Sequence, residues 1–296
     1  ISLSKRLKKD GIELFHGLSN ELPLGIAHSG VKSVVTIHDL IFMRLPELYK
    51  SFDRKVYLRK NRNAVREADQ IIAISQQTKQ DLIELLSADE RKINVVFQGC
   101  HPWFYDRREP SELDHIRTKY GLPEQYLLYV GTIEKRKNLL KIIKAVHCGG
   151  FDIPIVAVGR KTPYMDEINR YIRDQKVKNV QFIHYIPNND LPAVYQLSHA
   201  FVYPSAYEGF GIPILEALNS RIPLITSRGG CLEETAGPGG LLVDPEDADE
   251  MIDSISMIIS DQDLRASLVE SGLKHAMLFR PENTIPRLVD VYNKCF

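Results

Sequence analysis

Two carboxylates stand close together in the segment Ser205–Leu218, where seven residues separate Glu208 from Glu216. The segment follows an apolar run at Ala200–Tyr203, which predicts a buried strand, and it continues into an apolar helix. A glycine-containing loop at a helix N-terminus offers backbone N–H groups to an anionic or polyhydroxylated ligand. Carboxylates accept hydrogen bonds from sugar hydroxyls. The pattern therefore predicts a sugar-nucleotide site.

The alternative interpretation gives these two acids no ligand. Glu208 would cap the helix and Glu216 would lie on a solvated face. The apolar neighbours Ile212, Ile214 and Leu215 favour a mostly buried helix instead. An acid on such a helix needs a partner, because burying an unpaired charge is costly.

A second candidate segment is the loop Gly131–Asn138, which reads GTIEKRKN and follows an apolar run. Breaking a sugar–nucleotide bond leaves a diphosphate with extra negative charge, which fixed cations stabilise. Arg136 or Lys137 can clamp such phosphates. The alternative is a solvated basic turn, but cations at a helix start oppose the helix dipole. A bound anion would relieve that cost.

Three motifs in this order resemble those of retaining glycosyltransferases with the GT-B fold, specifically glycosyltransferase family four (group 1) of mannosyltransferase type. The segment Val34–Leu40, VVTIHDL, is similar to the family's His-Asp loop. The loop Gly131–Asn138 resembles its Gly-Thr-x-Glu-x-Arg-Lys-Asn donor loop, and Glu208 with Glu216 resembles its Glu-x7-Glu motif. The resemblance covers nearly the whole chain.

This resemblance implies a role for each matching residue. Glu208 and His38 would be catalytic: Glu208 acts at the reacting sugar, and His38 gives a hydrogen bond to a sugar hydroxyl or to developing charge. Glu216 would bind the ribose hydroxyls. Asp39 is expected to cap the following turn. The implied donor-binding residues are Gly131, Thr132, Arg136, Lys137, Ile186, Gly209, Phe210, Gly211, Ile212 and Glu216.

At two of these positions the sequence gives weaker support for a ligand-binding role. Thr132 stands where many family members have arginine, and a hydroxyl is a weaker phosphate ligand. Ile186 would meet the nucleotide base through its backbone, but its segment is equally well interpreted as a simple turn before a helix.

The acidic residues do not predict a metal site. No Asp-x-Asp pair follows an apolar strand, and Asp247-Ala248-Asp249 looks like a helix cap. The nine histidines show no metal-ligand spacing, and the four scattered cysteines favour free thiols in a reducing compartment. We expect no metal and no cofactor; a GDP- or UDP-hexose is the donor substrate.

Apolar runs alternate with helical patterns, which predicts an α/β fold with parallel sheets. The strands are expected near Ile12–His16, Ser33–His38, Gln70–Ile74, Asn94–Gln98, Tyr126–Gly131, Ile153–Gly159, Val180–His184, Ala200–Tyr203, Leu224–Thr226 and Leu241–Val243.

In the GT-B reading these elements form two doubly wound, Rossmann-like domains that face a cleft. Residues 1–105 would form the acceptor-side N-terminal domain and 106–296 the nucleotide-sugar-binding domain, with Gly99–Leu122 as the linker. The last helix either crosses back to the first domain or simply ends the second. Four strands precede the linker, six follow it, and no glycine-rich loop follows the first strand. We therefore expect the N-terminal domain to lack roughly its first 60–80 residues.

Charge and hydropathy limit the partners. Lysine plus arginine and aspartate plus glutamate each number 38, so net charge gives no indication of nucleic-acid binding. Between Lys50 and Arg66 there are seven bases and one acid. At helical spacing four of them share one face, either a solvated exterior or a contact for acidic lipid headgroups. No apolar run approaches the ~20 residues of a membrane span. We expect a cytoplasmic protein, peripheral at the inner membrane face.

The sequence thus predicts a retaining, metal-independent hexosyltransferase. It would move mannose from GDP-mannose to a glycan or lipid-linked acceptor in polysaccharide or lipopolysaccharide biosynthesis. The alternatives are another GT-B enzyme, a nucleotide-sugar epimerase or a phosphorylase, and a catalytically silent sugar-nucleotide-binding module. A dinucleotide-dependent dehydrogenase is disfavoured, because no Gly-x-Gly-x-x-Gly follows a strand.

Overall fold

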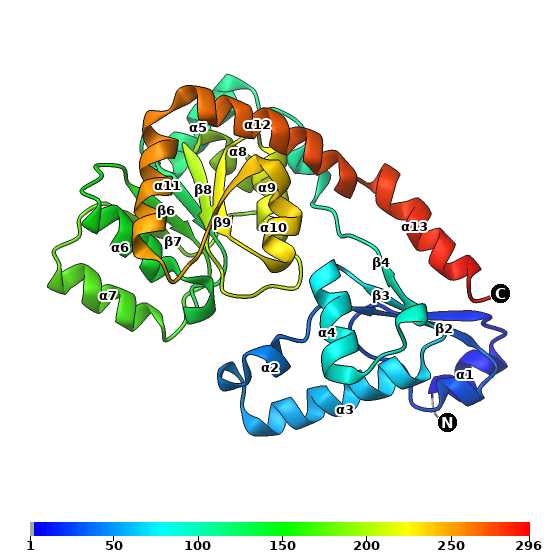
Figure 1. Ribbon diagram of the computed structural model, residues 1–296. Coiled ribbons are helices and arrows are strands. Elements are labelled where there is room, and N and C mark those ends of the chain that lie inside the picture. The colour runs from blue at the N-terminus through cyan, green and yellow to red at the C-terminus, as the bar shows by residue number, and fades with distance from the viewer. Residues whose placement is uncertain (1–2) are drawn as a thin grey trace. The chain divides into compact units, whose positions relative to one another are not determined.

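The computed structural model describes residues 3–296 and divides into two compact units (Figure 1). The first unit contains the residues up to Gly99 together with Glu208–Phe210 and Phe279–Phe296. The second contains Cys100–Tyr207 and Gly211–Leu278. The division therefore assigns the start of the Glu-x7-Glu segment and the C-terminal tail to the first unit.

The first unit is built on a four-stranded parallel sheet with the order β1-β2-β3-β4. Its strands are β1 (Leu14–Gly17), β2 (Lys32–Ile37), β3 (Gln70–Ala73) and β4 (Ile93–Val95). Its α-helices are α1 (Leu3–Lys9), α2 (Ile41–Arg44), α3 (Ser51–Glu67), α4 (Gln76–Leu86) and α13 (Pro281–Asn293). Since all neighbours are parallel, each strand returns through a crossover, and α3 and α4 supply two of these.

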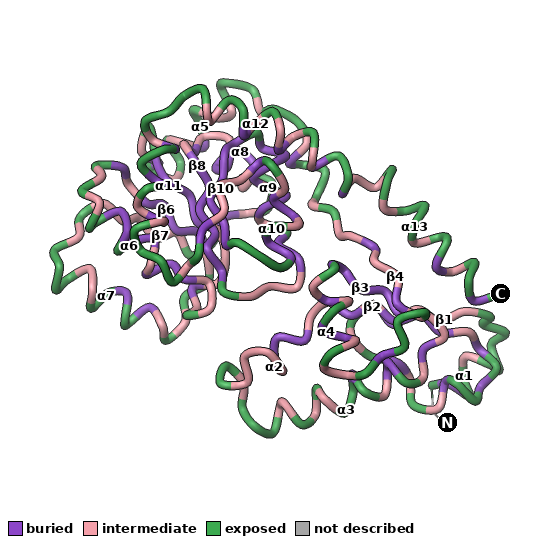
Figure 2. Tube along the Cα trace, viewed as in Figure 1, coloured by how far each residue is buried: buried purple, intermediate pink, exposed green. Residues whose placement is uncertain are grey.

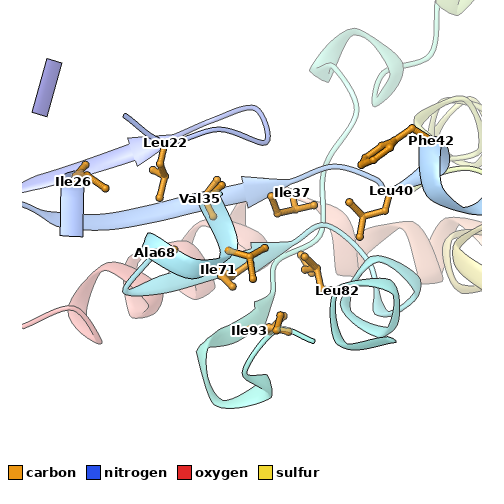
Figure 3. Packing of buried hydrophobic residues seen from close by; sticks show 14 of the residues in the cluster. Leu22, Ile26, Val35, Ile37, Leu40, Phe42, Ala68, Ile71, Leu82 and Ile93 are labelled. Carbon is orange, nitrogen blue, oxygen red and sulfur yellow. The ribbon is translucent and has the colours of Figure 1, made fainter. Parts of the chain in front are cut away.

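Both faces of this sheet are covered, which explains its nearly continuous apolar strands. Val35, Ile37 and Ile71 pack into one core together with residues of α3 and α4 (Figure 3). Val34 and Ile72, which alternate with them, belong to the opposite cluster, to which α13 supplies buried Val291. The period-two alternation of side chains along a strand assigns each residue to its face.

The terminal helix α13 is fixed to the first sheet by polar contacts as well. The hydroxyl of Tyr292 lies 2.8 Å from Nδ1 of His16, and Nζ of Lys294 donates to Oδ1 of Asn94 at 2.6 Å. Although it follows the second unit in the sequence, α13 completes the core of the first.

The second unit has a six-stranded parallel sheet with the order β10-β9-β8-β5-β6-β7. Its strands are β5 (Leu127–Val130), β6 (Ile155–Val158), β7 (Val180–Ile183), β8 (Ala200–Tyr203), β9 (Leu224–Ser227) and β10 (Gly240–Val243). Its α-helices are α5 (Pro110–Tyr120), α6 (Leu139–Cys148), α7 (Met165–Asp174), α8 (Leu191–Leu197), α9 (Ile212–Asn219), α10 (Gly230–Ala236), α11 (Ala248–Ser260) and α12 (Gln262–Ala276).

Helices cover both faces of this sheet. Its four inner strands are almost wholly buried, while the edge strands β7 and β10 are mostly half-buried (Figure 2). The chain runs outward from β5 through β6 to β7, then returns to β8 on the other side of β5. The strand order thus reverses between β5 and β8. In open α/β sheets, ligands bind at the carboxyl ends of the strands at such a reversal. The loops after β5 and β8 are therefore the first place to look for a site.

All ten predicted strands are present with shifted ends. The boundary between the two units follows Gly99, at the start of the predicted linker Gly99–Leu122, but the second half of that segment is not a linker. Most of its second half is α5, a helix that contacts α8 within the second unit. Pro110 is the first helical residue, where its missing N–H costs nothing, and Gly121 ends the helix in the left-handed conformation. Pro110, inside the predicted linker, thus begins a helix, and Ile116 is the one residue of α5 that is buried.

Candidate active site

The loop after β5 begins with a close backbone approach. A Cβ atom on Gly159, at the end of β6, would lie 1.8 Å from the carbonyl oxygen of Gly131. Only glycine fits there, so the loops after β5 and β6 are held in contact. Gly131 itself adopts φ of 156° and lies against the side chain of Lys137. The adjacent Thr132 is half-buried, and its carbonyl accepts a 3.0 Å hydrogen bond from the hydroxyl of Tyr129.

Arg136 connects the loop after β5 to the loop after β8. Its guanidinium forms an ion pair with Glu134 at 2.7 Å and donates to the carbonyl of Tyr207. Its own carbonyl accepts a 2.8 Å hydrogen bond from the backbone N–H of Ala206. The side chain is only 11% exposed. In this arrangement Arg136 holds two loops of the second unit together.

Lys137 lies beside Arg136 at the carboxyl end of β8. Its Nζ donates to the hydroxyl of Tyr203 at 2.7 Å and lies 5.3 Å from the centre of that ring. Next to it, Asn138 adopts the left-handed conformation and donates to the carbonyl of Pro204 at 2.8 Å. The ammonium group is thus positioned by β8 while remaining half-buried.

Glu216 projects from α9 against Tyr195 of α8. The hydroxyl of Tyr195 donates to Oε2 of Glu216 at 2.9 Å. Burial raises the pKa of the Glu216 carboxyl to about 7, although the hydrogen bond from Tyr195 opposes the shift. The predicted partner of this acid is therefore a buried tyrosine. Ionised Glu216 retains acceptor capacity that ribose hydroxyls can use.

The N-terminus of α9 requires the glycine that precedes it. Gly211 is the N-cap with φ of 110°, and a Cβ there would lie 3.0 Å from the side chain of Leu232. Ile212, the first helical residue, is 37% exposed. Ile186 follows β7 and is only 6% exposed, so any contact with a ligand base would use its backbone.

The tripeptide Glu208–Phe210 packs with the first unit. A Cβ on Gly209 would lie 2.2 Å from the carbonyl oxygen of His38, so this position also demands glycine. The Gly209 carbonyl accepts a 2.7 Å hydrogen bond from Oγ of Ser75. Phe210 is buried and lies stacked on Phe97, with ring centres 6.2 Å apart. Glu208 is half-buried.

His38 is held through both ring nitrogens. The amide nitrogen of Gln98 lies 3.2 Å from Nδ1, and Nε2 lies 2.9 Å from the carbonyl of Leu18. An amide N–H only donates and a carbonyl only accepts, so these two contacts fit the tautomer that carries its proton on Nε2. Its backbone N–H donates to Asn20 at 2.8 Å. The predicted cap is confirmed, since Asp39 accepts from the backbone N–H of Ile41 at 3.0 Å.

The predicted residues therefore fall into two groups. The second unit brings most donor-binding candidates to the ends of β5 and β8: Gly131, Thr132, Arg136, Lys137, Gly211, Ile212 and Glu216. Ile186 stands apart from them at the end of β7, two strands from β5. The first unit brings His38 together with Gly209 and, through the same tripeptide, Glu208 and Phe210.

Two basic residues at this edge escaped the sequence reasoning. Arg160 and Lys161 follow β6, are exposed, and form no ion pair with any residue in 3–296. The backbone N–H of Ile133 donates to the Arg160 carbonyl at 3.0 Å, which places them beside the loop after β5. The available signal was a Gly-Arg-Lys run directly after an apolar strand.

The described residues contain neither a cluster of metal-ligating side chains nor a helix that could span a membrane. Across 3–296 no group of three or more His, Cys, Asp or Glu side chains is arranged to hold a metal ion. The capping interpretation of Asp247 is confirmed, because its Oδ1 accepts from the N–H groups of Asp249 and Glu250 at 3.0 Å. No described helix combines the length and apolarity needed to cross a membrane.

Comparison with known proteins covers both units. Residues 112–275 match the sequence model described as Glycosyl transferases group 1, and residues 1–102 match the one described as Glycosyltransferase Family 4. The chain is 30% identical over 287 residues to O-antigen chain mannosyltransferase B of Escherichia coli, covering 94% of this chain and 74% of that protein.

Two further relatives carry similar names. O-antigen chain mannosyltransferase RfbU of Salmonella typhimurium is 29% identical over 215 residues, 72% of this chain and 57% of the relative. Serotype-specific mannosyltransferase WbdA of Escherichia coli is 27% identical over 295 residues, 96% of this chain and 36% of the relative. The chain thus spans less than two thirds of these two proteins.

Solved structures agree on the fold. Sucrose-phosphate synthase from Thermosynechococcus elongatus superposes with a TM-score of 0.80 at 22% identity, covering 98% of this chain and 75% of that one. Anabaena HepE in complex with UDP and glucose gives 0.81 at 19% identity, covering 98% and 81%. With the two parallel sheets, these neighbours confirm the predicted GT-B fold of two Rossmann-like domains.

Replacing Glu216 with glutamine should stabilise the protein at pH 8 and much less at pH 5. The folded pKa of about 7 lies above the ordinary 4.5, so the folded chain holds this proton more tightly. Wild-type stability therefore falls as the pH rises from 4.5 through 7, by roughly 3 kcal/mol in all. Glutamine does not titrate, so urea unfolding of Glu216→Gln should lack this loss.

Glu124→Gln is the matched control, because Glu124 is an exposed glutamate of the second unit. Its unfolding curve should follow wild type at both pH values. An equal response of Glu216→Gln and wild type to pH would refute the burial argument.

Proposed function

The chain belongs to the glycosyl transferases of group 1, and we propose that it transfers a hexose from a sugar nucleotide, held at the strand-order reversal of the second unit, to a glycan or lipid-linked acceptor. One observation carries this proposal. The loop after β5 and the segment after β8 are joined at the carboxyl ends of adjacent strands, and between them they present Lys137 and Glu216. A cation for phosphates and an acid for ribose hydroxyls are what a sugar nucleotide needs.

The donor we propose is GDP-mannose. Support comes from the names of the relatives, since O-antigen chain mannosyltransferase B, RfbU and WbdA are all called mannosyltransferases. UDP-hexose is the alternative, favoured by the likeness to HepE, which was solved with UDP and glucose. The O-antigen names also support a role in polysaccharide or lipopolysaccharide biosynthesis.

We propose that fixed cations take the place of a metal ion in stabilising the leaving diphosphate. Lys137 is positioned by its hydrogen bond to Tyr203, and Arg160 and Lys161 stand exposed on the neighbouring loop. Preorganised cations stabilise developing charge without reorganising during the reaction. Gly131 and Gly159 keep these two loops close to each other.

Retention of the anomeric configuration is the stereochemistry we propose. Attack would occur on the face that the leaving phosphate departs from, with that phosphate assisting deprotonation of the acceptor hydroxyl. Glu208 would act at the reacting sugar. The His38 ring contacts Gln98 and the Leu18 carbonyl, and it would give a hydrogen bond to a sugar hydroxyl by exchanging one of these contacts.

We also propose that the protein works at the cytoplasmic face of the inner membrane and contacts it through α3. Lys55, Arg59 and Arg62 are exposed, share one helix face, and form no ion pair with any described residue. They line a surface hollow of about 830 Å³ together with apolar residues that include Leu24, 70% exposed. Unpaired bases beside exposed apolar groups suit acidic phospholipids.

Lys137→Ala should weaken binding of GDP about tenfold to a hundredfold and leave guanosine binding unchanged. The lost interaction is a charge-assisted contact to phosphate, worth about 1.5–3 kcal/mol. Isothermal titration calorimetry with both ligands measures the difference. Lys135→Ala is the control, because Lys135 is exposed in the same loop. Equal losses for GDP and guanosine would contradict the phosphate role.

GDP release from GDP-mannose in the presence of acceptor should proceed at an unchanged rate after EDTA treatment. If Lys137 and its basic neighbours neutralise the diphosphate, no divalent ion is required. The assay follows GDP by a coupled enzyme and mannose incorporation by mass spectrometry. Strict dependence on Mg²⁺ would contradict the charge argument, and turnover of UDP-hexoses alone would move the donor assignment to the alternative.

Substituting Lys55, Arg59 and Arg62 together by glutamine should lower the affinity for acidic vesicles by roughly a hundredfold, at about 1 kcal/mol for each base. Sedimentation with vesicles of phosphatidylglycerol and phosphatidylcholine measures it, and pure phosphatidylcholine gives the charge-free baseline. Glutamines at Arg170, Lys176 and Lys178, exposed bases of the second unit, are the control. If the α3 variant binds acidic vesicles as tightly as wild type, the proposal is contradicted and this face of α3 is a solvated exterior.

A further inference from the structure

The first unit contains a second, smaller hollow of about 280 Å³. Its walls come from the loops after β1 and β2 and from α3. Asn20 and Asp39 contribute from the two loops, while Tyr57 and Asn61 contribute from the helix. The hollow therefore lies at the carboxyl ends of two adjacent parallel strands, the edge at which α/β sheets bind ligands.

Asn61 carries an unsatisfied acceptor in this wall. The residue is 3% exposed, and its Nδ2 donates to the carbonyl of Tyr57 at 2.9 Å, which fixes the orientation of the amide. Its Oδ1 accepts no hydrogen bond from any described residue. Leaving a buried amide oxygen unpaired costs about 1–3 kcal/mol. The oxygen is shielded from solvent, and Asn61 is one of the residues that line the hollow.

An aromatic wall stands beside Asn61. Tyr57 is 42% exposed, and its ring packs edge-on against Phe42, with centres 5.8 Å apart, and against Tyr49, with centres 6.2 Å apart. Phe42 is itself buried in the core of the unit (Figure 3). The exposed ring is thus held in place before any ligand arrives. Fixed aromatic surface combined with a few polar groups is typical of small-molecule sites.

The charge of the hollow decides which ligands fit. Its ionisable lining residues are Glu21, Asp39 and Lys60, and Lys60 forms an ion pair with Glu21 at 3.0 Å. Two carboxylates and one paired ammonium leave no cation for a phosphate or a carboxylate ligand. A neutral molecule with hydroxyl groups meets no repulsion here, and its hydroxyls supply the donor that Asn61 lacks.

We propose that this hollow binds the neutral terminal pyranose of the acceptor. The inference rests on the proposed function, because it assigns the acceptor end of the same reaction. The ring face would lie against Tyr57, and one hydroxyl would donate to Oδ1 of Asn61. Asn20 lines the hollow and accepts from the backbone N–H of His38 at 2.8 Å, and Asp39 follows His38. A sugar in the hollow therefore contacts the residues that position the candidate catalytic histidine.

The test combines direct binding with kinetics. Methyl α-D-mannopyranoside, methyl α-D-glucopyranoside and inorganic phosphate are titrated into the protein without nucleotide, and binding is followed by saturation-transfer NMR. We expect both glycosides to bind weakly, phosphate not to displace them, and Tyr57→Ala to weaken binding about tenfold or more, the loss of roughly one aromatic contact. Asn61→Leu should give a similar loss.

In turnover, both variants should raise the acceptor KM about tenfold, while the donor KM and the kcat at saturating acceptor change less than about twofold. Phe52→Ala is the matched control, because Phe52 is an aromatic residue of α3 that is 75% exposed and does not line the hollow. Thermal unfolding of each variant checks folding, and exposed Tyr57 keeps the test valid if Asn61→Leu is unstable.

Glycosides that bind Tyr57→Ala as tightly as wild type, or that fail to bind wild type at about 50 mM, would overturn the proposal. Displacement by phosphate would also overturn it, since it would make the hollow an anion site. Glycoside binding needs no donor, so it can fail while GDP-mannose is still turned over. It can equally survive if the proposed transfer reaction is wrong.

Discussion

The candidate donor site depends on the hydrogen bonds by which Arg136 joins the loop after β5 to the loop after β8. Its carbonyl accepts from Ala206 and its guanidinium donates to the carbonyl of Tyr207. A parallel sheet brings the two strand ends together but leaves the loops beyond them to find their own partners. Arg136 supplies those partners with both its backbone carbonyl and its guanidinium group. The neighbouring Lys137 thereby occupies a fixed place against Tyr203, which is the preorganisation that binding a diphosphate requires.

Glu216 shows that residues of this candidate site are held in an energetically unfavourable environment. A carboxylate held against buried Tyr195 is disfavoured by its surroundings, and burial raises its pKa to about 7. In the unliganded protein the acid gains one hydrogen bond from the tyrosine, which does not compensate for its lost hydration. Ligand hydroxyls would add the missing donors. Strain of this kind, absorbed by a well-packed helix, is characteristic of residues retained for binding and not for stability.

The sequence predicted those parts of the molecule that depend on local pattern. Apolar runs located every strand. That the Glu-x7-Glu and basic-loop segments follow adjacent strands was seen only in the structure. It failed where a residue type has two meanings: a proline is common in linkers, but Pro110, inside the predicted linker, begins α5. The sequence also could not reveal contacts that form only on folding, such as the ion pair of Arg136 with Glu134 and its hydrogen bond to Tyr207. Asn61 has no motif at all; its significance appears only when its unpaired oxygen is placed in a hollow.

The two hollows of the first unit differ in the charge of their lining residues. Glu21 and Lys60 line both of its hollows, and their 3.0 Å contact stands between them. On one side Lys55, Arg59 and Arg62 leave an excess of positive charge; on the other, Asp39 leaves the hollow slightly negative. Anions are attracted to the first and repelled from the second. A neutral sugar in the smaller hollow and an acidic lipid surface at the larger one, as proposed above, would each meet a charge that suits it. Lys60 lines both hollows and is paired with Glu21, so the aromatic hollow has no unpaired cation among its lining residues.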